Sequence, residues 1–316
     1  MNDINTPTRD KEGRFLRAQS QLRSWVTVDG LPGPSGIGGF KAEPDRYHLY
    51  VALNCPWAHR TLVLRKLKGL EDMISLSIVM PQRTDEGWAF GDYPGSTADT
   101  VNGFSHLRDL YFATTSDYSG RFTVPVLWDK EHGVVVNNES SEIIRMFNAA
   151  FVEYTDDDVD YYPERLRPEI DEVNNFVYER INNGVYRAGF ATSQSAYEEG
   201  YAMVFEALDS LEGRLASQRY LVGDQLTEAD WRLFPTLIRF EFTYHGVFRC
   251  NKRRLVDYKN LWGYTLDLYQ TPGVASTVNV DHIKAGYWRR GDRNPSGIIP
   301  KGPFVDLDAP HGRENL

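Results

Sequence analysis

Residues 47–60 read Tyr-His-Leu-Tyr-Val-Ala-Leu-Asn-Cys-Pro-Trp-Ala-His-Arg, and this stretch decides the fold of the first half of the chain. Residues 47–53 are rich in aromatic and β-branched side chains, which predicts a strand. Leucines at 62, 64, 67 and 70 follow at helical spacing, and a second apolar run at 74–80 predicts another strand. The order strand, helix, strand is typical of a βαβ unit and favours a parallel sheet.

A hairpin is predicted further along the first half. Apolar segments at 122–128 and 133–136 are separated by Asp-Lys-Glu-His, and helical spacing returns from Ser140. Pro125 lies inside the first segment and has no N–H to donate to a ladder. The proline therefore implies a sheet edge, a bulge or a cis bond.

The second half of the chain is predicted to be helical. Apolar residues recur at three- and four-residue spacing over 163–269, whereas the acidic run at 155–160 predicts a solvated linker because like charges repel. Thr227 and Asp230 stand three residues apart before an apolar run, which predicts a capping box. We expect an irregular N-terminal arm at 1–45, a first domain at 46–152, a linker at 153–160, a helical domain at 161–285 and a tail at 286–316.

We expect an irregular N-terminal arm that packs on a folded body, although its sequence leaves open whether it is ordered. It is rich in glycine, proline and charge and shows no sustained period. Its apolar side chains are the candidate anchors: Phe15, Leu16, Leu22, Trp25, Val26 and Val28.

Composition excludes several classes of protein. The 316 residues include 35 lysines and arginines against 44 aspartates and glutamates, and the net charge of −9 argues against a dedicated binder of nucleic acid or anionic membranes. No apolar run approaches the roughly 18 residues of a transmembrane helix, and residues 1–10 lack the apolar core of a signal peptide. Two cysteines are too few for a disulfide framework, and the seven histidines show no metal-ligand spacing. We expect a cytoplasmic protein without a metal.

Cys55 is the candidate nucleophile. It lies between a strand end and a helix start, where unpaired N–H groups and the helix dipole stabilise a thiolate. Pro56 suits the first helical turn, where its missing N–H would have no partner. Position 58 is Ala, so a mixed disulfide at Cys55 must be resolved by an external thiol. The alternative is that Cys55 fills a buried apolar space, and for Cys250 helix packing is the favoured interpretation.

These motifs together resemble a known family. The motifs are Asn54-Cys-Pro-Trp-Ala-His-Arg60, Thr123-Val-Pro-Val-Leu-Trp-Asp129, Asn137-Asn-Glu-Ser-Ser-Glu-Ile-Ile-Arg-Met146 and Leu226-Thr-Glu-Ala-Asp230. The chain is similar to cysteine-type glutathione transferases and, more narrowly, resembles the S-glutathionyl-hydroquinone reductases of the xi class. The resemblance extends from about residue 45 to 305. It implies an N-terminal thioredoxin-like α/β domain followed by a C-terminal all-α glutathione-transferase domain.

The resemblance assigns roles in glutathione binding. It makes Cys55 the nucleophile and Val124, before a cis Pro125, the backbone clamp on the cysteine of glutathione. Glu139 and Ser140 would hold the γ-glutamyl end. Main-chain groups can bind an extended peptide like an added strand, and a helix start offers N–H donors to a carboxylate.

Four further residues match positions of this family. Trp88 and Arg121 would be additional glutathione contacts, with Arg121 suited to a bidentate carboxylate bond. Tyr186 and Tyr287 would bind the oxygens of the hydroquinone ring or supply a proton. The alternatives are an exposed loop aromatic for Trp88, a strand-flanking residue for Arg121, and packing for the tyrosines.

The chain departs from the family pattern near its end. The family usually has His-Tyr-Tyr after the lysine-containing stretch, whereas this chain has Gly286-Tyr287-Trp288. Arg289-Arg-Gly then replaces a Ser-His pair. These differences leave the details of the substrate pocket open.

The implied reaction is the glutathione-dependent reduction of S-glutathionyl-hydroquinones. A mixed disulfide of Cys55 with glutathione would form, hydroquinone would leave, and a second glutathione would release oxidised glutathione. The implied partners are glutathione, aromatic glutathionyl conjugates and a second copy of the chain in a homodimer. Two alternatives remain: an omega-type thiol transferase or dehydroascorbate reductase, and a non-catalytic ligand-binding protein.

Overall fold

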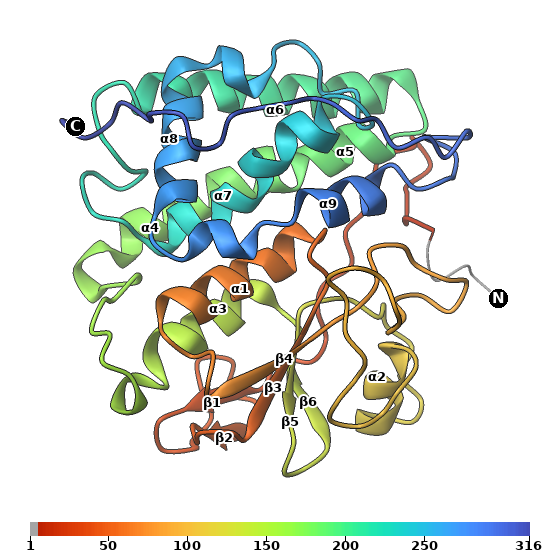
Figure 1. Cartoon of the computed structure of the whole chain (residues 1–316), viewed down its shortest axis with the longest axis vertical. Helices are drawn as coiled ribbons and strands as arrows, with labels where there is room; N and C mark the ends of the chain where they lie inside the picture. The colour runs from red at the N-terminus through yellow and green to blue at the C-terminus, as the bar shows by residue number, and fades with distance from the viewer. Residues whose placement is uncertain (1–5) are drawn as a thin grey trace. The chain divides into compact units, whose positions relative to one another are not determined.

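The computed structural model describes residues 6–316, which fall into two compact units (Figure 1). The first unit contains Thr6, Ala18–Asp160 and Thr277–His282. The second contains Pro7–Arg17, Tyr161–Ser276 and Ile283–Leu316.

A four-stranded mixed sheet forms the centre of the first unit, in the order β4-β3-β5-β6. β3 (Tyr47–Val51) pairs in parallel with β4 (Ile74–Ile78), which confirms the predicted βαβ unit. β5 (Val126–Asp129) is antiparallel to β3 and to β6 (Val134–Asn137). The expectation of a parallel sheet therefore holds only for the first pair. The short turn between β5 and β6 reverses the chain and makes that pair antiparallel.

Two helices of this unit pack against each other. α1 (Pro56–Leu67) and α3 (Ser140–Ala149) lie side by side, while α2 (Arg108–Thr114), which the sequence pattern did not predict, contacts β6 (Figure 1). The first hairpin strand begins at Val126 rather than at residue 122, because Pro125 before it has no N–H for the ladder. The Val124–Pro125 bond is cis, one of the three possibilities that the sequence left open.

The N-terminal arm is more regular than predicted. β1 (Trp25–Thr27) and β2 (Gly39–Lys41) form a short parallel pair, and the Ser24 N–H donates to the Val136 carbonyl over 3.0 Å. The arm thus protects the β6 edge of the main sheet, which would otherwise expose unpaired backbone groups. Among the predicted anchors Trp25 and Val26 are buried, but Leu16 and Val28 are 47% and 43% exposed, so for those two the prediction was wrong.

The acidic segment at 155–160 is tied to the body of the first unit. Lys68, which is fully buried, donates to the carbonyls of Asp157 and Val159 over 3.2 and 2.7 Å and pairs with the Asp157 carboxylate. Asn148 donates to Asp160 over 2.7 Å. The expectation that like charges keep this segment in solvent was incomplete, because a buried lysine needs acceptors and the segment supplies them.

The second unit is helical, as predicted for 163–269. Its helices are α4 (Arg167–Val177), α5 (Gly184–Phe190), α6 (Gln194–Arg214), α7 (Glu228–Arg239), α8 (Lys259–Gln270) and the C-terminal part of α9 (Val280–Tyr287). Wider π-helical turns follow α4 and α7 at Tyr178–Asn182 and Phe240–Tyr244. α5 and α6 make the most extensive helix contact (Figure 1). Short 3₁₀ turns lie at Val152–Tyr154, Glu164–Leu166, Leu255–Asp257 and Val274–Thr277.

The predicted capping box at the start of α7 is confirmed. The Thr227 N–H donates to the Asp230 carboxylate over 2.8 Å, and the Thr227 hydroxyl accepts from the Ala229 N–H over 3.3 Å. Asp230 also accepts from the Leu221 N–H and the Tyr264 hydroxyl, over 2.9 and 2.7 Å. The buried carboxylate therefore joins the loop before α7, α7 itself and α8.

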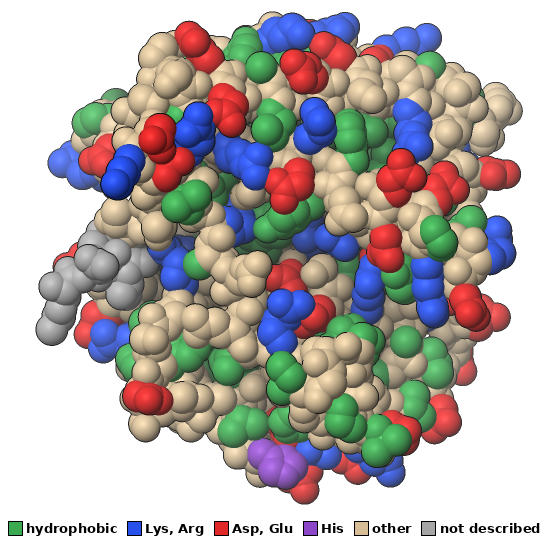
Figure 2. All heavy atoms as spheres, turned by 180° about the vertical axis from the view of Figure 1, so that it is seen from behind, with side chains coloured by type: hydrophobic (Ala, Val, Ile, Leu, Met, Phe, Trp, Pro, Cys, Tyr) green, Lys and Arg blue, Asp and Glu red, His purple; other side chains and the backbone are tan. Residues whose placement is uncertain are grey.

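Acidic and basic side chains are interspersed with apolar ones over the face shown in Figure 2. This distribution fits the modest net charge of −9 over 316 residues. Within residues 6–316 no helix combines the length and the apolar character that crossing a bilayer requires.

Candidate functional site

Cys55 occupies the N-cap position of α1. Its backbone is extended, with φ −82° and ψ 121°, and Pro56 takes the first helical position as predicted. The Cys55 carbonyl accepts from the His59 N–H over 3.0 Å, so the helix starts directly at the thiol. The side chain is partly accessible, and the alternative of a buried apolar filler does not fit. The N–H groups of the first helical turn, next to Cys55 in the chain, have no partner within the helix.

Val124 lies beside the thiol. The Cys55 Sγ is 3.6 Å from the Val124 carbonyl oxygen, so the segment before β5 meets the start of α1. In the described part of the chain the Val124 N–H donates to no other group, although the residue is buried. Most N–H groups of buried residues have a partner, so this one is a free donor for an extended peptide next to the thiol.

Glu139 and Ser140 lie at the start of α3. Glu139 is the N-cap, and its carboxylate accepts from the Ser141 N–H over 3.1 Å and from the Ser20 hydroxyl over 3.1 Å. Burial alone would raise the pKa of Glu139, but the hydrogen bonds from Ser141 and the charge of Arg60 hold it below its usual value. The carboxylate is therefore an anion at neutral pH.

Arg60 connects the two helices of this site. It is buried on α1, donates to the Ser140 hydroxyl over 3.3 Å and stacks on Trp57 at 4.5 Å. Ser140 is the first residue of α3, so its N–H has no partner within the helix. One carboxylate and one helix-start N–H thus lie together, which suits an amino acid end that carries both an ammonium and a carboxylate.

Trp88 and Arg121 occupy the loops of the first unit. Trp88 is buried, which contradicts its alternative as an exposed loop aromatic, and Arg83 stacks on its ring at 4.3 Å. Its indole N–H has no acceptor among residues 6–316 and is therefore a donor that a ligand could use. Arg121 donates to the Thr6 carbonyl over 2.9 Å and is partly accessible.

Tyr186 and Tyr287 lie next to each other in the second unit. Tyr186 lies in α5, Tyr287 ends α9, and their hydroxyl oxygens are 2.5 Å apart. Tyr244 joins them, with its hydroxyl 3.1 Å from that of Tyr287. Burial, reinforced by the neighbouring phenols, raises the pKa values of Tyr244 and Tyr287 well above normal, so both stay protonated at neutral pH. These hydroxyls can donate a hydrogen bond or a proton.

Sequence reasoning missed three residues of these clusters. Arg60 stood inside the quoted motif around Cys55 without being singled out, although a buried arginine beside a helix-start carboxylate has a recognisable role. Ser20 lies in the arm and contacts Glu139 only through the fold. Tyr244 is one of 18 tyrosines in the chain, and its sequence neighbours do not distinguish it from the others.

Cys250 is a packing residue, as favoured by the sequence. Its side chain is fully buried, and burial raises its pKa to about 12. The charge of Arg249 acts in the opposite direction but does not reverse this effect. At neutral pH Cys250 therefore has almost no thiolate with which to attack a disulfide.

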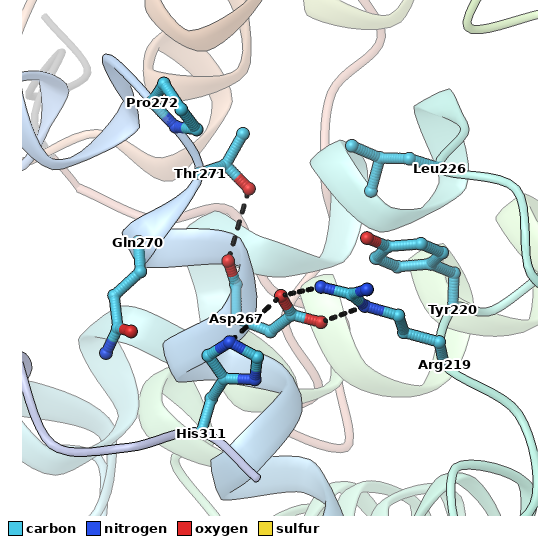
Figure 3. Close-up of a pocket in the computed structure, with 8 residues that line it drawn as sticks. All are labelled: Arg219, Tyr220, Leu226, Asp267, Gln270, Thr271, Pro272 and His311. Atoms are coloured by element: carbon cyan, nitrogen blue, oxygen red, sulfur yellow. Dashed lines mark hydrogen bonds and ion pairs between the residues drawn. The ribbon is translucent and has the colours of Figure 1, made fainter. Parts of the chain in front are cut away.

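A cavity of about 320 Å³ in the second unit is lined by residues of α8, the loop before α7 and the tail (Figure 3). Arg219 binds the Asp267 carboxylate with two hydrogen bonds of 2.8 Å, and His311 lies 3.7 Å from the same carboxylate. The Gln270 amide donates to two tail carbonyls, of Leu307 and Ala309. The polar groups are thus occupied in attaching the tail, which leaves little chemistry for a ligand.

Asp129, Glu131 and His132 offer ligand atoms within 4.8 Å of one another. However, Arg46 already binds both oxygens of Asp129, over 3.0 and 2.8 Å, and a metal ion would have to displace it. This group adds nothing to the chemistry around Cys55, and the absence of a metal stays a prediction.

Comparison with known proteins places these features in context. Residues 54–150 match the glutathione S-transferase N-terminal domain, and residues 194–265 match the glutathione S-transferase C-terminal domain. Over 309 residues the chain is 55% identical to Glutathionyl-hydroquinone reductase YqjG of Escherichia coli K12, covering 97% of this chain and 94% of that protein. It is 49% identical over 306 residues to Glutathionyl-hydroquinone reductase PcpF of Sphingobium chlorophenolicum, covering 95% and 93%.

The fold agrees with a solved relative. The glutathione-bound structure of YqjG from Escherichia coli K-12 superposes with a TM-score of 0.91 at 56% identity, covering 93% of this chain and 96% of that one. Together with the two matched domains, this similarity confirms the predicted thioredoxin-like domain followed by a helical domain.

Proposed function

Since the chain belongs to the glutathione transferase family, in its xi class of glutathionyl-hydroquinone reductases, we propose that it reduces S-glutathionyl-hydroquinones to hydroquinones with glutathione as co-substrate. The observation that carries the proposal is the partly accessible thiol of Cys55, 3.6 Å from the Val124 carbonyl at the start of α1. A thiol alone would serve many reactions. The adjoining peptide-binding and amino-acid-binding groups point to glutathione.

The reaction runs in two displacements. The Cys55 thiolate attacks the sulfur of the conjugate, the bond between that sulfur and the ring carbon breaks, and its electron pair takes up a proton on the ring. Hydroquinone leaves, and Cys55 is left in a disulfide with glutathione. The thiolate of a second glutathione then attacks the glutathione sulfur of that disulfide and expels the Cys55 thiolate. The products are hydroquinone and oxidised glutathione, and the second glutathione is the reductant.

Five residues of the first unit would hold the tripeptide. The Val124 N–H and carbonyl bind the cysteine of glutathione as an added strand would. Glu139 accepts from the γ-glutamyl ammonium, and the Ser140 N–H donates to the neighbouring carboxylate. The Trp88 indole N–H and the Arg121 guanidinium complete the contacts. With a charged partner, each such hydrogen bond stabilises binding by about 1.5–3 kcal/mol.

The tyrosines would act on the ring. Tyr287 stays protonated because burial raises its pKa, and it shares a hydrogen bond with Tyr186. A phenol hydroxyl in this state donates to a ring oxygen and stabilises the negative charge that develops as the carbon–sulfur bond breaks. We propose that both tyrosines serve this step.

The deciding experiment measures hydroquinone release from its glutathionyl conjugate with and without glutathione, beside dehydroascorbate reduction by the same preparation. The proposal expects glutathione-dependent release at a rate well above dehydroascorbate reduction, and no release by Cys55→Ser. A chain that reduces dehydroascorbate and leaves the conjugate intact is an omega-type thiol transferase. Binding of glutathione without either turnover would identify a ligand-binding protein. We further propose that the chain forms a homodimer in the cytoplasm. Size-exclusion chromatography with light scattering measures the mass of the assembly and so tests the dimer.

A further inference from the structure

Arg293 lies in the turn at 291–294 of the second unit, and three further arginines are near enough for their charges to act on it. We call the four the arginine cluster: Arg9, Arg249, Arg289 and Arg293. The Arg293 guanidinium stacks over the rings of Phe190 and Phe248, at 4.4 and 5.5 Å from their centroids. Arg9 reaches the same place, because its Nε donates to the Phe190 carbonyl over 2.8 Å. Arg249 directly follows Phe248 in the chain, and its exposed guanidinium lies over the Tyr197 ring at 5.8 Å from the centroid.

The cluster has no counter-charge of its own. Within residues 6–316 none of the four guanidinium groups lies within 4.0 Å of a carboxylate oxygen, and the buried Nε of Arg293 has no acceptor. Burial and the charges of Arg289, Arg9 and Arg249 lower the pKa of Arg293 to about 10, although Asp292 opposes them. Several like charges in a partly buried place repel one another, and an anion would relieve that repulsion.

The turn that presents Arg293 is fixed before any ligand arrives. Gly291 and Asn294 exchange backbone hydrogen bonds of 3.3 and 3.0 Å, and the Asn294 amide donates to the carbonyls of Trp288 and Ile298. Trp288 is itself anchored, because its indole N–H donates to the Phe242 carbonyl over 2.8 Å. A charged group held in place in this way loses little conformational entropy on binding.

The cluster adjoins the tyrosines that we assign to the ring. Phe190 lies 5.6 Å from Tyr186 between ring centroids, and Phe248 lies 5.5 Å from Tyr287. One aromatic ring therefore separates Arg293 from each tyrosine. Of the four arginines, Arg289 stands at a position where this chain departs from the family pattern.

We propose that the arginine cluster binds an acidic substituent on the aromatic part of the conjugate, so that the chain prefers carboxylated glutathionyl-hydroquinones over uncharged ones. This inference rests on the proposed function. A carboxylate accepts two hydrogen bonds from a guanidinium fork, and a stacked arginine presents that fork in a fixed plane. An aromatic acid also suits this cluster, because its ring can pack on the phenyl rings of Phe190 and Phe248 while its carboxylate binds a guanidinium group.

The test uses the full chain and four probes: hydroquinone, 2,5-dihydroxybenzoate and the glutathionyl conjugate of each. Calorimetry gives the dissociation constants of the two free rings, and initial rates give kcat/KM for the two conjugates. We expect the carboxylated probe to be favoured at least about tenfold at low salt, the factor that one added charged hydrogen bond supplies. Arg293→Gln should reduce this preference to less than about threefold, and raising the salt concentration should weaken it in the wild type.

Arg290→Gln is the matched control, because Arg290 is the exposed neighbour that donates to the Ser296 carbonyl outside the cluster. It should keep the wild-type preference. Arg293→Lys, which keeps the charge and loses the fork, should fall between the wild type and Arg293→Gln. The melting temperature of Arg293→Gln should be unchanged or higher, since a repelling charge has been removed.

The outcomes separate this inference from the proposed function. Turnover of both conjugates at equal kcat/KM overturns the inference and leaves the function intact. An Arg293-dependent preference for free 2,5-dihydroxybenzoate without turnover of either conjugate supports the anion site and overturns the function. A loss of melting temperature in Arg293→Gln with an unchanged preference, or a change confined to the KM of glutathione, overturns the inference.

Discussion

The hydroxyl oxygens of Tyr186 and Tyr287 lie 2.5 Å apart, although 101 positions separate the two residues in the sequence. α5 supplies one and the last residue of α9 supplies the other. Their rings also contact Phe248, at 5.4 and 5.5 Å between centroids. The two hydroxyls share one hydrogen bond and are surrounded by aromatic side chains. Such a site can bind an aromatic ring that carries oxygen atoms, because the ring packs on the aromatic side chains and its oxygens bind the hydroxyls.

This pair gives the first prediction. Tyr186→Phe and Tyr287→Phe should each lower the rate on glutathionyl-hydroquinone by about tenfold or more, which corresponds to about 1.4 kcal/mol in the transition state. Turnover of a small glutathione mixed disulfide should change little, because that substrate has no ring. Tyr201→Phe, in α6 of the same unit, should behave as the wild type on both substrates. Equal losses on both substrates would instead indicate general damage to the fold.

The second prediction distinguishes the two cysteines. Cys55→Ser should abolish turnover with an unchanged circular dichroism spectrum, because a hydroxyl forms no mixed disulfide and differs little in volume from a thiol. Cys250→Ser should retain activity, since Cys250 is buried and its pKa is raised to about 12. Intact mass after mixing with oxidised glutathione should show one added glutathione. Peptide mapping that places this modification on Cys250 would contradict the assignment.

Much of the first unit could be predicted because its sequence signals are local. The strand before Cys55, Pro56 in the first turn and the helix at Ser140 each follow from neighbouring residues. The short strands β1 and β2 escaped prediction because strands of three residues are too brief to show a period.

Other parts of the site depend on contacts that are distant in sequence. Ser20 reaches Glu139 across 119 positions, and Tyr244 joins Tyr287 across 43. No local pattern marks Ser20 or Tyr244, because their contacts in the folded chain depend on how whole helices and strands pack together. The unused N–H of Val124 is likewise visible only once every backbone partner is known.

The third prediction concerns the start of α7. Thr227→Ala should lower the free energy of unfolding by about 0.5–2 kcal/mol through the loss of the cap. Asp230→Ala should lower it further, because the Leu221 N–H and the Tyr264 hydroxyl would also lose their buried acceptor, at about 1–3 kcal/mol each. Urea unfolding measures both values. The rate per folded molecule should stay near normal, and a lost rate at unchanged stability would assign these residues to the active site.

The last prediction is a pH dependence of stability that originates in His48. This histidine is fully buried on β3, with its ring nitrogens 2.6 and 2.9 Å from the hydroxyls of Ser75 and Ser77. Burial lowers its pKa from 6.5 to about 4, so the unfolded chain takes up a proton between these values and the folded chain does not. The contribution of neutral His48 is therefore fully present above pH 6.5 and is lost as the pH falls toward 4. At about 1.4 kcal/mol per pKa unit the loss amounts to about 3 kcal/mol.

His48→Gln should remove this part of the slope of unfolding free energy against pH, measured by urea titration from pH 7.5 to 4.5. An identical slope in His48→Gln and the wild type would mean that other groups cause the acid sensitivity.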